Sequence, residues 1–155
     1  NIPIIADPKL TGLHRTHDVD WIIFQSRGFE LMKRRIGEGE DSVAAKSLID
    51  SYGWKHLVVL AGEDGVTIYS KSYDTVHVAC TLPQLRQVIG LIDAAVVAIA
   101  VSISNGFSVA DTALLTNAAC ECILSAEASD SFSLSKDMLI HRVGEIAWNL
   151  QVSKR

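Results

Sequence analysis

Short apolar runs along the chain alternate with longer segments whose apolar residues recur at helical spacing. Strands are predicted at Ile2–Ala6, Asp20–Phe24, Leu57–Leu60, Val66–Tyr69 and Thr75–Ala79. Helices are predicted at Phe29–Arg35, Ser42–Tyr52, Ala94–Ser104, Val109–Leu124 and Leu134–Leu150. Because strands and helices alternate apart from one hairpin, the pattern predicts an α/β fold with helices on both faces of a largely parallel sheet.

The segment Ala94–Ser104 is apolar on nearly all sides, which is typical of a helix buried in a core. The wider stretch 88–104 is the most hydrophobic part of the chain. It is too short for a membrane span, contains Asp93 and lacks basic flanks, so we expect a buried helix and no membrane partner. Ser108 is the expected N-cap of the following helix.

Composition narrows the class of protein further. The 155 residues are 48% hydrophobic and 21% charged, which suits one globular domain with a real core. The net charge of −4 and the 6% of aromatic residues argue against nucleic acid as a partner. No basic leader is visible at Asn1, so we expect the chain to begin within a protein or after processing.

The cysteines indicate a reducing compartment. Three of them, Cys80, Cys120 and Cys122, are too few and too unevenly spaced for a disulfide framework, which favours free thiols and a cytoplasmic location. Cys120 and Cys122 have no second ligand pair at zinc-site spacing, so no metal site is predicted. The plain alternative is that Cys120 and Cys122 are two small thiols in a helix, with at most one of them facing the core.

Four motifs occur in a distinctive order. They are D-P-K at Asp7–Lys9, V-V-L-A-G-E-D-G-V at Val58–Val66, the apolar run Val88–Ser108, and L-L-T-N-A-A at Leu114–Ala119. This order resembles the C-terminal half of the ribokinase-like (PfkB family) carbohydrate kinases, nearest to the heptose-phosphate kinase branch. The resemblance implies a three-layer α/β/α ribokinase-like fold. It also implies that 1–155 is one partial domain, the nucleotide-binding half, without the N-terminal sugar and lid half.

The family's catalytic motif, D-x-T-G-A-G-D, falls on residues 87–93. The resemblance makes Asp93 the general base, while Gly90 and Ile92 occupy positions of the phosphate anion hole. Glycines there let backbone N–H groups approach a phosphate at a helix N-terminus. Because Ile92 stands where the family has glycine, we expect a narrowed or occluded hole. The plain alternative is that Asp93 is an ordinary acid at the start of a helix.

Two further motifs point to the adenine side of a nucleotide site. Gly62 and Gly65 match the family's G-x-x-G hairpin, and Asn117 matches the N-A-A of the helix beside the adenine. The alternatives are that the glycines only form a turn and that Asn117 bonds to backbone. In the family Glu121 would be a small residue.

The Mg²⁺-ordering motif of the family, T-P-N-x-x-E, is degenerate. Gln25 takes the place of the Asn and Gly28 that of the Glu, so Mg²⁺ binding is in doubt. Asp7 and Lys9 are either pocket residues or a surface turn.

Three hypotheses follow. The first is a degenerate sugar-kinase-like domain that binds ATP, with Mg²⁺ doubtful, but transfers little phosphate. The second is an active ATP-dependent kinase of a sugar or sugar phosphate, completed by an N-terminal half. The third is a structural or assembly module without a ligand. The expected partners are a nucleotide, a sugar or sugar phosphate if active, and either a second copy or the N-terminal half docked on an apolar surface.

Overall fold

The computed structural model describes residues 2–83, 89–126 and 134–154. Its strands are β1 (Ile5–Ala6), β2 (Trp21–Gln25), β3 (His56–Leu60), β4 (Val66–Ser70), β5 (Thr75–Val78) and β6 (Leu150–Ser153). Its helices are α1 (Ser26–Ile36), α2 (Asp41–Tyr52), α3 (Leu91–Ser104), α4 (Val109–Ser125) and α5 (Lys136–Ile146). Short 3-10 turns are η1 (Leu10–Arg15), η2 (Gly62–Asp64) and η3 (Ala147–Asn149).

One sheet carries all six of these strands in the order β1-β2-β3-β4-β5-β6. The pairs β1–β2 and β2–β3 are parallel, whereas β3–β4, β4–β5 and β5–β6 are antiparallel. The α/β class is confirmed. The antiparallel part is larger than the sequence indicated, because short turns at 61–65 and 71–74 leave no room for crossovers and β6 adds a further antiparallel strand.

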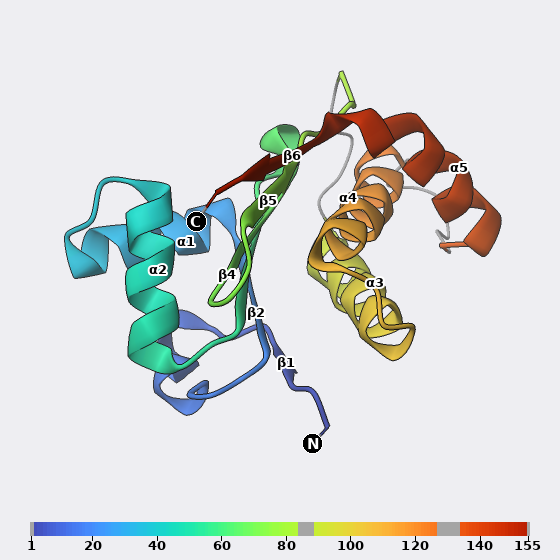
Figure 1. Ribbon diagram of the computed structural model, residues 1–155. Helices are drawn as coiled ribbons and strands as arrows, with labels where there is room; N and C mark the ends of the chain where they lie inside the picture. The colour runs from blue at the N-terminus through green and yellow to red at the C-terminus, as the bar shows by residue number, and fades with distance from the viewer. Residues whose placement is uncertain (1, 84–88, 127–133, 155) are drawn as a thin grey trace.

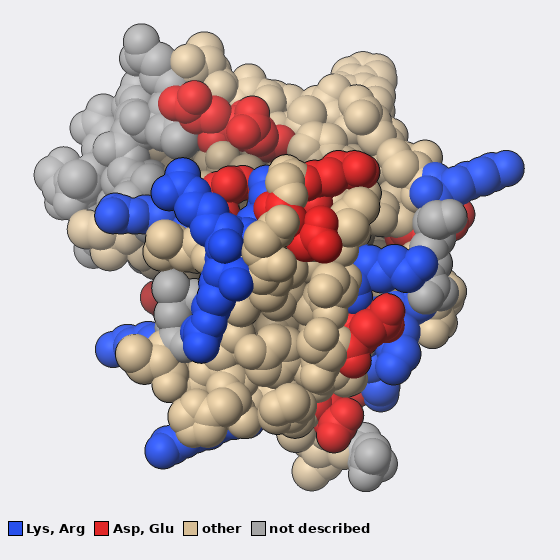
Figure 2. Space-filling model, turned by 90° about the vertical axis from the view of Figure 1, so that its left-hand side faces the viewer, with Lys and Arg blue, Asp and Glu red and all other residues tan. Residues whose placement is uncertain are grey.

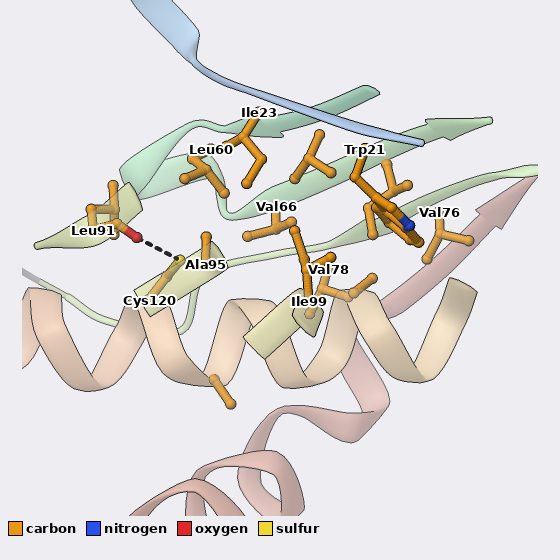
Figure 3. Close-up of a cluster of buried hydrophobic side chains, with 14 of the residues drawn as sticks. Trp21, Ile23, Leu60, Val66, Val76, Val78, Leu91, Ala95, Ile99 and Cys120 are labelled. Atoms are coloured by element: carbon orange, nitrogen blue, oxygen red, sulfur yellow. Dashed lines mark hydrogen bonds between the residues drawn. The ribbon is translucent and has the colours of Figure 1, made fainter. Parts of the chain in front are cut away.

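Helices cover both faces of the sheet: α1 and α2 lie on one face, and α3 and α4 on the other (Figure 1). Successive side chains along the strands point to opposite faces, so each strand contributes to the core on both sides of the sheet. Ile22 and Leu57 belong to the cluster under α1 and α2, whereas their neighbours Ile23 and Val58 belong to the cluster under α3 and α4. Figure 3 shows side chains of the cluster under α3 and α4, where Val66 and Val78 from the strands meet Ile99 from α3.

The C-terminal segment differs from the sequence expectation. The helix predicted over Leu134–Leu150 ends at Ile146, and the chain continues through η3 into β6. Ile146 is fully buried, whereas Met138 is 40% exposed. The strand was missed because Leu150–Ser153 has too few residues to show a pattern of its own.

The α4 helix is buried on both sides. Cys120 and Cys122 are both buried, which corrects the expectation that at most one of them faces the core. The reason is that α4 is sandwiched: Cys120 belongs to the sheet-side cluster, and α5 packs on α4 as well. Both thiols, like the half-buried Cys80, are free.

An apolar groove lies open between α3, α4 and α5. It has a volume of about 830 Å³ and its α3 wall includes Val97 and Val101, which are 61% and 43% exposed. The α3 helix is therefore buried on its sheet side and open on its outer side, although its sequence is apolar nearly all round. Over the described ranges, no helix has both the length and the hydropathy to cross a membrane.

His56 is a buried titratable group at the start of β3. Its ring stacks on Trp21 at 4.0 Å between centroids, and its Nδ1 lies 2.9 Å from the Ser70 hydroxyl. Burial, and secondarily the charge of Lys55, lowers the pKa of His56 from 6.5 to about 4, while Asp20 opposes the shift. The fold thus accommodates the neutral imidazole.

The first prediction concerns acid stability. Because the pKa of His56 is lower in the folded chain, its contribution is fully present above pH 6.5 and is lost as the pH falls toward 4. That contribution is about 3 kcal/mol at most. Urea unfolding of wild type and His56→Gln at pH 7 and pH 4.5 should show a smaller pH dependence in the variant. An equal pH dependence would contradict the assignment; the comparison also cancels the effect of Asp20, whose lowered pKa acts in the same direction.

Candidate functional site

A small hollow lies where β2 and β3 end. It has a volume of about 260 Å³ and is lined by Gln25, Ser26, Leu60, Ala61, Gly62, Glu63, Asp64 and Leu91. These residues come from the starts of α1 and α3 and from the turn after β3. In open α/β sheets this edge, at the carboxyl ends of the strands, is where ligands bind. We call it the strand-end hollow.

Two helix N-termini that lack side-chain caps border this hollow. Gln25 is the N-cap of α1 and Gly90 that of α3, and neither helix has a side-chain cap. By contrast, Ser108 accepts a hydrogen bond from the Asp111 N–H at 3.1 Å, and so caps α4 as predicted. Uncapped first-turn N–H groups and the helix dipole favour an anion. The hollow is thus suited to a phosphate, although Glu63 and Asp64 oppose it in part.

Gly90 and Ile92 shape the start of α3. Gly90 adopts a left-handed conformation with φ of 85°, and a Cβ placed there would meet nothing within 4 Å. The side chain of Ile92 packs against the sheet-side core cluster. It does not line the strand-end hollow, so it does not narrow the hollow in the way the sequence led us to expect.

Asp7 and Asp93 face one another across the ends of β1 and α3. Both side chains are exposed. Partial burial, and secondarily the charge of Asp93, raises the pKa of Asp7, while Lys9 lowers it. The structure therefore brings together three residues that the sequence assigned separately to a pocket and to catalysis. A pair of carboxylates beside a helix N-terminus can accept a proton from a hydroxyl group.

The fold itself requires a glycine at position 65. It closes the turn with φ of 89°, and a Cβ at this position would lie 2.0 Å from the Val78 oxygen and 2.7 Å from the Cys80 nitrogen. Gly62, with φ of 58°, lines the strand-end hollow. Of the two glycines, Gly62 is the one at the candidate site.

Asn117 lies in a buried polar network. Its side-chain amide donates to the Ala79 carbonyl at 3.4 Å and to Glu121 Oε1 at 3.1 Å. The Glu121 carboxylate is fully buried and also accepts from the Thr81 backbone and hydroxyl at 2.7 and 2.8 Å. Arg142 lies 3.7 Å from it. Asn117 lines neither the strand-end hollow nor the apolar groove, and its plain structural role accounts for its contacts.

Sequence reasoning did not select Glu63, Asp64 or Leu91, which line the hollow beside the assigned residues. The sequence signal that could have found them is their position next to Gly62 and Gly90 in the chain. Across the described residues, no cluster of three or more His, Cys, Asp or Glu is arranged to hold a metal ion. Burial raises the pKa of the Cys80 and Cys122 thiols, which disfavours thiolate chemistry.

Comparison with solved structures defines the class of fold. Ribokinase from Thermotoga maritima superposes with a TM-score of 0.79 at 19% identity, over 93% of this chain and 50% of that one. Phosphofructokinase-2 from Escherichia coli gives 0.75 at 15% identity, over 94% and 48%. The fold is thus that of the ribokinase-like sugar kinases, as the motif order predicted.

The sequence relatives share one name. The bifunctional protein HldE of Aliivibrio fischeri is 24% identical over 120 residues, or 77% of this chain and 25% of that protein. HldE of Photobacterium profundum is 26% identical over 133 residues, or 84% and 28%. No protein-family model matches the chain. The chain spans about a quarter of the curated relatives and about half of the solved structures.

The second prediction distinguishes two reasons for a glycine, which are a positive φ and the lack of space for a Cβ. Gly65 and Gly106 both have positive φ, 89° and 66°, but a Cβ at Gly106 would meet nothing within 4 Å. Gly106→Ala should cost about 1 kcal/mol of unfolding free energy from backbone strain alone. Gly65→Ala should cost more by several kcal/mol, since the chain at 78–80 must move. Denaturant unfolding measures both; equal costs would refute the close approach.

Proposed function

We propose that the chain is a sugar-kinase-like nucleotide-binding domain in which phosphoryl transfer is weak or absent. The observation that carries the proposal is the joint placement of Asp93, facing Asp7, and the strand-end hollow at the start of α3. A phosphate in the hollow would lie against the uncapped N–H groups of α1 and α3, and a substrate hydroxyl would lie near Asp93. Asp93 itself borders the apolar groove, and in this proposal it acts as the general base.

ATP is the nucleotide that the ribokinase-like resemblance implies, with its phosphates in the strand-end hollow. Mg²⁺ would bridge those phosphates and needs only one or two protein carboxylates. Glu63 and Asp64 line the hollow and offer such groups. When bound, the ion would neutralise phosphate charge and lessen the repulsion from these acids.

Weak catalysis is proposed because several family positions have lost their chemistry. Gly28 has no side chain with which to order Mg²⁺, and Gln25 replaces an asparagine at the hollow. On the adenine side, the carboxylate of Glu121 stands where the family has a small residue. No Lys or Arg side chain lines the strand-end hollow to offset the negative charge of a phosphate. The charged residues that line it are Glu63 and Asp64.

The second candidate is an active ATP-dependent kinase of a sugar or sugar phosphate. The Asp7–Asp93 pair favours it, since two exposed carboxylates near the start of α3 can accept a proton from a substrate hydroxyl. An assay of ADP release with a panel of sugar phosphates distinguishes the candidates. Titration with ATP at fixed Mg²⁺ tests the nucleotide-binding proposal itself, and no ATP binding would leave the structural module as the better description.

The third prediction assigns Asp93 its role. Asp93→Asn should lower any ADP release by about 10²-fold or more, because a general base contributes about 10²–10⁴-fold. The unfolding free energy should change by less than about 1 kcal/mol. Asp111→Asn is the matched control, since Asp111 is also an exposed first-turn acid but lies at the start of α4. Equal loss in both variants, or none in Asp93→Asn, would remove Asp93 from catalysis.

We also propose that the apolar groove is where the other half of a ribokinase-like fold packs. The solved structures with this fold are about twice as long, and the groove leaves Val97, Val101 and Ile140 exposed. A protein surface seldom leaves so many apolar side chains together without a partner.

The fourth prediction tests the groove as a docking surface. Light scattering should show the 155-residue chain as a monomer that binds a dye specific for apolar surface, and Val97→Lys should reduce the dye signal. Lys replaces an exposed side chain, so the fold should persist. A stable dimer that excludes the dye in wild type, and dissociates in Val97→Lys, would instead assign the groove to a second copy.

A further inference from the structure

A second hollow lies on the α1/α2 side of the sheet, away from α3 and α4. It has a volume of about 180 Å³ and is bordered by α2, by the end of β4, by the start of β5 and by the residue after β6. Lys46, Lys71 and Lys154 line it. These lysines are far apart in sequence, and only the fold brings them to one place. We call it the lysine hollow.

Hydroxyl groups complete the lining. Ser42, Tyr69, Ser70 and Thr75 all border the same space. The Ser70 hydroxyl pairs with His56 Nδ1 at 2.9 Å on the opposite face of the sheet from Tyr69, so it is not one of the donors of this hollow. Ammonium and hydroxyl groups are the donors that an oxyanion requires.

The charge around the hollow is opposite to that of the whole chain. The net charge is −4, yet the lining has three lysines and a single carboxylate, that of Asp50. The neighbouring Asp41 is paired with Lys33 on α1. Within the described residues, the side chains of the three lysines form no ion pair at 4.0 Å or less. Figure 2 shows the α1/α2 side, where basic side chains form groups separated by acidic ones.

We propose that the lysine hollow binds a small phosphate-bearing anion at a site separate from the strand-end hollow. A small hollow bordered by three lysines and by the hydroxyl-bearing residues Ser42, Tyr69 and Thr75 matches a single phosphoryl group in size and charge. It does not match a nucleic acid strand, which needs an extended basic track. No residue is shared with the candidate nucleotide site, so this proposal stands whether or not that site binds ATP.

Titration of the ¹⁵N-labelled 155-residue chain with inorganic phosphate, followed by NMR, tests the proposal. Ionic strength is held constant with NaCl, so that general screening of the lysine charges does not change during the titration. We expect saturable shifts at the amides of Ser70, Lys71 and Thr75. A sugar phosphate and a nucleoside monophosphate, titrated in the same way, identify which carrier of the phosphoryl group the site prefers.

The fifth prediction uses substitutions on the exposed lysines. Lys46→Met combined with Lys71→Met should weaken phosphate binding at these amides by about tenfold or more, because two charged donors are lost. Lys136→Met, an exposed lysine on α5, is the matched control and should leave binding unchanged.

Two results would overturn the proposal. One is the absence of saturable shifts at Ser70, Lys71 and Thr75. The other is binding at these amides that the double lysine variant leaves unchanged. Shifts confined to Gly62 and Leu91 would belong to the strand-end hollow; they would support the proposed function and reject the lysine hollow.

Discussion

The buried carboxylate of Glu121 joins three separate parts of the molecule. It accepts hydrogen bonds from Thr81, which follows β5, and from Asn117 on its own helix, and it lies near Arg142 on α5. A buried charge is tolerable only when its oxygens are satisfied, so these three elements must keep their places together. The chain between Thr81 and α3 is thereby anchored at one end, and the α4 and α5 helices are tied to each other beside the sheet.

The candidate site lies next to this arrangement, since the thiol of Cys120, the neighbour of Glu121, is 4.0 Å from the carbonyl oxygen of Leu91 at the start of α3. The α3 helix packs on the sheet through Ala95 and Ile99, which fixes where its N-terminus points. The first turn then meets the ends of β1, β2 and β3, where Asp7 and Gln25 already stand. A rigid scaffold with uncapped helix starts at its edge is what oriented anion binding requires.

Local patterns predicted much of the fold. Helices α1 to α4 and strands β2 to β5 follow from apolar spacing, and Ser108 marks the start of α4 as expected. Tertiary packing decided the rest. β6 depends on pairing with β5, and the burial of Cys122 depends on α5, so neither is visible locally. At the site, motifs carry Gln25 and Gly62, which line the strand-end hollow, whereas the catalytic role of Asp93 stays a prediction. The inward packing of Ile92 was not predictable, since it depends on the helix's rotation against the sheet.

The tight approach of the chain at Gly65 changes how this turn should be interpreted in variants of the protein. Any side chain there would collide with the backbone at 78–80, so selection for folding alone keeps the position as glycine. A survey that scores invariance would therefore rank Gly65 with functional residues even in chains that bind nothing. Tolerance to substitution at Gly90, where a Cβ meets open space, carries more information about the loss of a ligand.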